Sequence, residues 1–127
     1  MSESNSVFIK TNVSISEVKI CLEKIINCQL EKVNDVDWEL YSTCLFGLDI
    51  ALFEATDFED DRELNLSQFN YLVSIEYLRG TFDIEYEFDW RRMASIVLGN
   101  IISKKLSCEC LIVHNMESVV ERFLPEN

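Results

Sequence analysis

The chain is poor in the residues that interrupt regular structure. Only one proline and three glycines occur among its 127 residues, whereas linkers and low-complexity tracts are rich in such residues. Nowhere do about 18 apolar residues follow one another, so the sequence predicts no membrane-spanning helix. With 48% hydrophobic residues, the chain has enough apolar side chains for one core. We therefore expect a single globular domain over residues 1–127.

The scarcity of glycine and histidine also restricts catalysis. Three scattered glycines form no phosphate-binding loop, no serine lies in a G-x-S-x-G turn, and any Ser–His or Cys–His pair would have to use His114. Acids at alternate positions along a strand lie roughly 6.5–7 Å apart. This spacing falls within the range of separations between the two catalytic carboxyl groups of glycosidases. Acids that face solvent nevertheless lack the burial that would separate their pKa values. The sequence predicts no catalytic residue and no cofactor.

Metal-binding patterns are incomplete. Asp57, Glu59 and Asp61 fit a calcium loop, but Arg62 stands where glycine is needed and Gln68 where a bidentate acid is needed. No metal site is predicted there.

The cysteine and histidine pattern near the end of the chain also falls short of a metal site. Cys108, Cys110 and His114 share one parity of a strand, yet they lack the C-x-x-C knuckle of a zinc site. Buried thiols beside a hydrogen-bonded histidine are the favoured interpretation.

The five cysteines favour a reducing compartment. They are odd in number, and each lies in an apolar context. The opening residues MSESNSVFIK also lack the basic and apolar regions of a signal peptide. These features predict a cytoplasmic protein with free thiols.

Basic residues are nearly missing from the middle of the chain. Residues 33–90 hold fifteen acids and two bases, whereas the remaining residues hold eight acids and nine bases, within a net charge of −12. An acidic surface does not attract nucleic acid or anionic membranes, because phosphate binding needs Lys and Arg. It suits a basic protein partner.

Hydrophobic periodicity predicts an α+β domain. The apolar stripe of residues 14–27 and the capping box of Ser14 and Glu17 indicate an amphipathic helix that buries Cys21. The expected elements are strand 6–13, helix 14–27, one bent strand or two strands about Gly47 within 38–53, acidic loop 54–68, strand 69–78, strand 81–88, helix 90–105 with Asp89 as its cap, strand 108–114 and a short helix 117–123. We expect the element order β-α-β-β-β-β-α-β-α. This order predicts a mainly antiparallel sheet of five to six strands with two main helices on one face. The net charge of the helices should be close to zero.

The stretch FDIEYEFDW (82–90) alternates large apolar residues with acids. As a strand it would turn one face to the core and a row of carboxylates to solvent. That row and the acidic loop together predict a surface for a basic partner. The expected contact residues are Asp57, Glu59, Asp60, Asp61, Asp83, Glu85 and Glu87, with Phe58 as the apolar anchor.

As a pattern, the chain resembles the small acidic immunity proteins of bacterial polymorphic-toxin and contact-dependent growth inhibition systems. The resemblance runs from Trp38 through GLDIALF (47–53), DFEDD (57–61) and FNYLVSIEY (69–77) to CLIVHN (110–115). It implies a cytosolic antitoxin that binds a cognate toxin domain, often a basic nuclease, and blocks its active site. It supplies no catalytic residue.

The residues themselves support an acidic binding protein, and we expect it to be a monomer or weak dimer. One alternative is a DNA mimic or general acidic adaptor, which would bind several unrelated basic proteins. A small hydrolase or metal-binding enzyme is the least favoured alternative.

Overall fold

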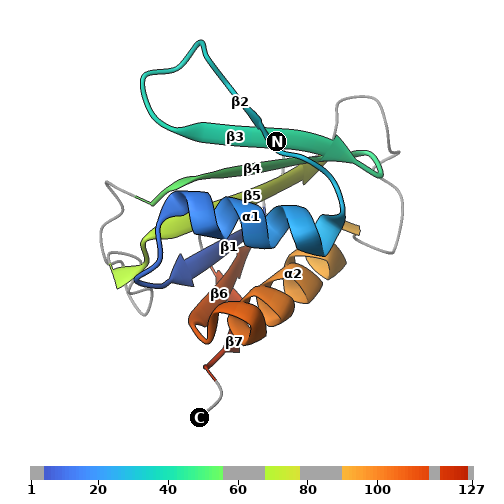
Figure 1. Ribbon diagram of the computed structural model, residues 1–127. Coiled ribbons are helices and arrows are strands. Elements are labelled where there is room, and N and C mark those ends of the chain that lie inside the picture. The colour runs from blue at the N-terminus through green and yellow to red at the C-terminus, as the bar shows by residue number, and fades with distance from the viewer. Residues whose placement is uncertain (1–4, 56–67, 78–89, 115–117, 126–127) are drawn as a thin grey trace.

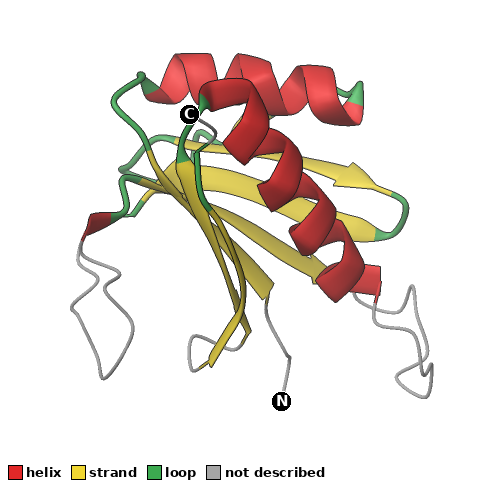
Figure 2. Ribbon diagram, turned by 90° about the horizontal axis from the view of Figure 1, so that it is seen from below, coloured by secondary structure: helices red, strands yellow, loops and turns green. Residues whose placement is uncertain are grey.

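The computed structural model describes residues 5–55, 68–77, 90–114 and 118–125. These residues form a seven-stranded antiparallel sheet with two helices on the same face (Figures 1 and 2). The elements are β1 (Asn5–Lys10), α1 (Ile15–Ile26), β2 (Glu31–Lys32), β3 (Leu40–Leu45), β4 (Leu48–Glu54), β5 (Tyr71–Tyr77), α2 (Trp90–Leu106), β6 (Glu109–His114) and β7 (Ser118–Phe123). The α+β class and the two helices on one face are confirmed, and the sheet is larger than predicted.

The first strand of the chain lies inside the sheet. The strand order is β2-β3-β4-β5-β1-β6-β7, so β1 pairs with β5 on one side and with β6 on the other. Helix α2 connects β5 to β6 and packs across β1 and β6. Because β1 is paired on both edges and packed on both faces, its residues Val7, Phe8 and Ile9 are fully buried.

Helix α1 begins and ends where local chemistry dictates. The Ser14 hydroxyl accepts a hydrogen bond from the Glu17 backbone N–H at 3.3 Å, which is one half of the predicted capping box. Asn27 ends the helix in the left-handed conformation, with φ 54°. Between these ends, Ile15, Val18 and Leu22 face the sheet as a buried stripe.

Two parts of the predicted element order are wrong. Residues 118–123 form strand β7 and not a helix, because neighbouring valines favour a strand and the free edge of β6 offers pairing partners for their backbone. The two-residue strand β2 was not predicted, since it is too short to show a period. Residues 38–53 were predicted to form one bent strand or two strands about Gly47. The structure has two strands, β3 and β4.

Some predicted elements lie outside the described residues, namely strand 81–88, most of loop 54–68 and the Asp89 cap. Within the described part, the Tyr77 hydroxyl caps α2, since it accepts the Trp90 backbone N–H at 2.8 Å.

Each face of the sheet has its own buried cluster. Under the helices, side chains from α1, α2 and the central strands form the larger core, which includes Val7, Leu22, Leu52, Ile75, Ile102 and Ile112. The opposite face carries a smaller cluster of Phe8, Ala55, Phe69, Leu72, Leu111 and Val113. Burial on both faces explains the apolar runs at residues 7–9 of β1 and 110–113 of β6, as the sequence predicted for β6.

Glu23 connects the end of α1 to the segment that follows it. Its carboxylate accepts the Leu30 backbone N–H at 2.7 Å and pairs with Lys19 at 3.2 Å. The hydrogen bond from Leu30 is the main cause of a lowered Glu23 pKa. A lowered pKa in the folded state stabilises the fold above the unfolded-state pKa of about 4.3. That contribution is lost as the pH falls through the folded-state value.

Replacement of Glu23 with Gln should therefore lower Tm at pH 7, and the difference from the wild type should shrink below about pH 4. Thermal unfolding, followed by circular dichroism across pH 3–7, measures the Tm of each protein and how their difference changes with pH. Glu31→Gln, on an exposed side chain, is the control. A Tm difference independent of pH would show that the carboxylate charge is not involved.

Candidate functional site

The partner-binding residues predicted from the sequence lie outside the described residues. They are Asp57, Phe58, Glu59, Asp60, Asp61, Asp83, Glu85 and Glu87. Their role stays a prediction. The described residues nevertheless include an acidic surface close to these segments in sequence, on the strands β4 and β5 that precede them.

This surface is the face of β3, β4 and β5 that the helices do not cover. Side chains alternate across a strand, and Leu48, Ile50 and Leu52 face the helices. Their neighbours Asp49 and Ala51 therefore face the other side, at the open sheet face. Small or polar residues share that face: Ser42, Cys44, Ala51 and Ser74.

Two acids lie directly opposite one another on the open sheet face. Asp49 of β4 is the register partner of Glu76 of β5. Like charges in directly opposed positions destabilise a sheet. Within the described part of the chain, no base forms an ion pair with either carboxylate. The acid pair is therefore kept at some cost to the fold.

Charge is separated between the two sides of the molecule. Helices α1 and α2 together carry six bases and two acids, and α2 has four bases and no acid. The helix pair is thus clearly positive, which corrects the expectation that it is close to neutral. Beyond the helices, residues 31–39 add four exposed acids against one exposed base, Lys32, and the open sheet face adds Asp49 and Glu76. Bases gather on the helices and acids gather on the sheet and its connections.

The β3–β4 turn lies at the end of the open sheet face. Leu45 pairs with Leu48, so Phe46 and Gly47 alone form the turn. Both have positive φ angles, 50° for Phe46 and 76° for Gly47. A two-residue turn of this kind matches the twist of the strands but normally has Asn, Asp or Gly at both positions. Phe46 is 75% exposed.

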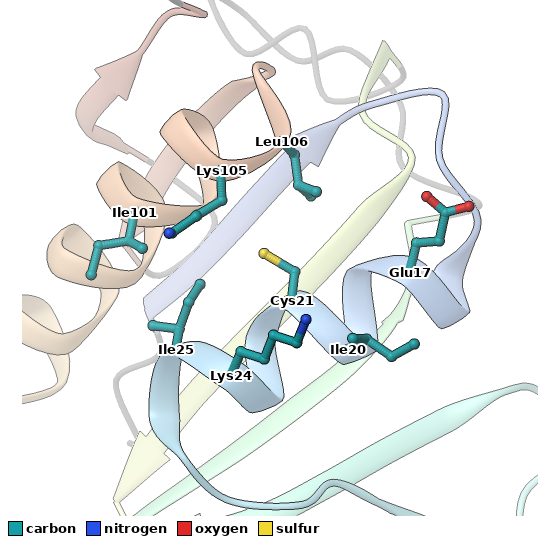
Figure 3. Close-up of a pocket in the computed structure, with 8 residues that line it drawn as sticks. All are labelled: Glu17, Ile20, Cys21, Lys24, Ile25, Ile101, Lys105 and Leu106. Carbon is teal, nitrogen blue, oxygen red and sulfur yellow. The ribbon is translucent and has the colours of Figure 1, made fainter.

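A groove of about 640 Å³ runs between the two helices (Figure 3). It is lined by Glu17, Ile20, Cys21, Lys24, Ile25, Ile101, Lys105 and Leu106. Apolar side chains from both helices form its walls, and its charged lining residues are two bases, Lys24 and Lys105, and one acid, Glu17. The groove thus has a small excess of positive charge, whereas the open sheet face is acidic.

Cys21 lies in this groove. Figure 3 shows its sulfur projecting from α1 into the space between the helices. The thiol is half-buried, not part of the fully buried stripe as predicted, and burial is the main cause of a raised Cys21 pKa. A raised pKa leaves little thiolate at neutral pH, so Cys21 is a poor nucleophile.

The cysteine and histidine pattern near the end of the chain forms no metal site in the described residues. The Cys108 and Cys110 sulfurs are buried and 4.0 Å apart, and their contact together with burial raises the pKa of Cys110. His114 lies four residues along β6, with its Nδ1 at 3.2 Å from the Asn5 Oδ1. No group of three or more His, Cys, Asp or Glu side chains in the described ranges is arranged to hold a metal ion.

The start of α2 is held by polar contacts. The Arg91 guanidinium lies 4.3 Å above the Tyr77 ring, while the Tyr77 hydroxyl accepts backbone N–H groups of Trp90 and Arg91. Arg91 is buried. Its contacts with Tyr77 of β5 hold the start of α2 against the sheet.

The sequence reasoning missed Phe46, Asp49 and Glu76 as functional candidates. A usable signal for Phe46 was the Phe-Gly pair at the centre of an expected strand pair, where Asn-Gly is usual. For the two acids there was no signal, because they become neighbours only through the register of β4 and β5.

Comparison of the chain with protein-family models, with curated proteins and with solved structures finds no match. None of the described helices combines the length and the apolar character needed to cross a membrane.

Proposed function

We propose that this protein is an acidic immunity protein that binds and neutralises a cognate toxin domain, one that is basic and of the nuclease type. The observation that carries the proposal is the Asp49–Glu76 pair on the open sheet face. Among the described residues no base forms an ion pair with either carboxylate, and a basic partner surface that covers the pair would supply the counter-charge.

The separation of charge supports a directional encounter. With bases on the helices and acids on the opposite side, a basic partner is steered toward the open sheet face and away from α2. Electrostatic attraction of this kind raises the association rate and selects the partner more than it raises affinity. Fast capture suits an inhibitor that must act before its target does. The resemblance to immunity proteins points the same way.

The test begins with capture of the partner. The tagged protein is purified from its native host at low and at high salt, and the retained proteins are identified by mass spectrometry. We expect one basic protein, retained less at high salt because exposed charges are screened. If no basic protein is retained, the proposal is wrong. Several unrelated basic proteins would favour the DNA mimic or general adaptor.

A matched pair of variants then locates the interface. Asp49→Asn/Glu76→Gln removes two acids from the open sheet face, and Glu17→Gln/Glu121→Gln removes two exposed acids elsewhere. Both double variants have the same net charge. We expect the first to slow association with the captured basic protein by about 3- to 10-fold relative to the second. Stopped-flow fluorescence or surface plasmon resonance measures the rates. Equal rates for the two variants would place the interface away from this face.

A further inference from the structure

The β3–β4 turn presents an aromatic side chain that the fold does not use. Phe46 is 75% exposed, the largest fraction among the large apolar side chains of the described residues. Such a side chain is a candidate anchor for a partner, because aromatic residues dominate the energetic centres of protein interfaces.

The backbone conformation at Phe46 disfavours a bulky side chain, so the needs of folding do not explain a phenylalanine there. A φ of 50° is left-handed, a conformation in which a bulky side chain is disfavoured and in which Asn, Asp or Gly is usual. Asparagine at this position would suit the turn better and would remove an exposed ring from water. Neither the backbone nor the core explains the phenylalanine.

The acid pair lies next to the turn. Leu45 and Leu48 form the first pair after the turn, Asp49 follows on the next rung, and Glu76 is opposite Asp49. Successive residues of a strand are about 3.4 Å apart. One end of the open sheet face therefore combines an exposed aromatic ring with two carboxylates. The ring and the acid pair each lower the stability of the fold.

We propose that Phe46 is the apolar anchor of the complex and that the β3–β4 turn enters a pocket of the partner whose rim carries Lys or Arg. This rests on the proposed function, which supplies a basic partner. The ring fills the desolvated centre, and Asp49 with Glu76 meets the basic rim. Phe58, the anchor expected from the sequence, lies outside the described residues, and Phe46 is the described side chain with the matching environment.

Site-specific photo-crosslinking tests the contact. The photoreactive residue p-benzoylphenylalanine is placed at position 46, and at position 124 as a control, because Leu124 is also exposed, at 64%. Cells of the native host are irradiated, and adducts are identified by mass spectrometry. We expect one predominant adduct from position 46, with the basic protein that wild-type protein retains, and none from position 124. No adduct at 46, or the same adducts at both positions, would overturn the proposal.

The Phe46→Asn variant separates binding from folding. Because Asn-Gly is favoured in this turn, the variant should have an unchanged or higher Tm while its affinity for the captured basic protein falls at least about 10-fold. Phe46→Tyr keeps a ring and should retain most of the affinity. If Phe46→Asn binds as the wild type does, the anchor is refuted and the proposed function stands. If the wild type itself retains no basic protein, both are refuted.

Discussion

Replacement of Phe8 with Ala is expected to lower the free energy of unfolding by about 3–5 kcal/mol. Phe8 is fully buried in the cluster on the face that the helices leave uncovered. Its ring packs edge-on against Phe69, with centroids 6.1 Å apart and an angle of 74° between the planes. Leu72 and Leu111 complete its surroundings. Removing the ring would leave a cavity between β1 and Phe69 that the paired strands cannot close.

Urea unfolding followed by fluorescence or circular dichroism measures this change. Trp38→Ala is the control: Trp38 is 59% exposed, and its removal should change the free energy of unfolding by no more than about 0.5 kcal/mol. If Phe8→Ala costs as little as Trp38→Ala, the second cluster contributes nothing to the fold.

Replacement of Gly99 with Val should cost about 3 kcal/mol. Gly99 lies inside α2, where glycine is a poor helix former by roughly 1 kcal/mol. Its lack of a side chain lets the helix approach β1 and β6. A Cβ at this position would overlap with Cδ1 of Ile112 and lie 3.5 Å from Cγ1 of Val7. Both neighbours are fully buried, so neither moves without disturbing the core.

A double-mutant cycle assigns the cost to one atom. Gly99→Ala adds the Cβ that overlaps with Ile112, and Ile112→Val removes the Cδ1 with which it overlaps. The double variant should therefore be more stable than the sum of the single changes by at least about 0.5 kcal/mol. Chemical denaturation of the four proteins measures the coupling. Strict additivity would mean that Gly99 is required for another reason.

Local chemistry made much of the fold predictable. The Ser14 cap and the stripe of Val18 and Leu22 define α1 without reference to the rest of the chain. The continuous apolar run of β6 predicted a strand buried on both faces, and Gly47 marked the turn between β3 and β4. In each case the signal lies within a few residues of the element that it specifies.

Elements that depend on distant partners were less predictable. Strand β7 is short and mostly exposed, and its neighbouring valines only favour a strand, which forms because the edge of β6 offers pairing partners. The same holds for the candidate site, because Asp49 and Glu76 are far apart in sequence and meet through strand register alone. Periodicity shows which face a residue occupies, but not which residue lies beside it.

The central position of β1 has a consequence for how the protein is made. Strand β1 is synthesised before both of the strands with which it pairs, which contribute residues 71–75 of β5 and 109–114 of β6. Contacts between residues so far apart in sequence slow folding, since a long loop must close before they can form. The second edge of β1 cannot be paired until β6 has been synthesised. A chain cut short before β6 would leave one edge of β1 unpaired, with its apolar residues exposed to aggregation.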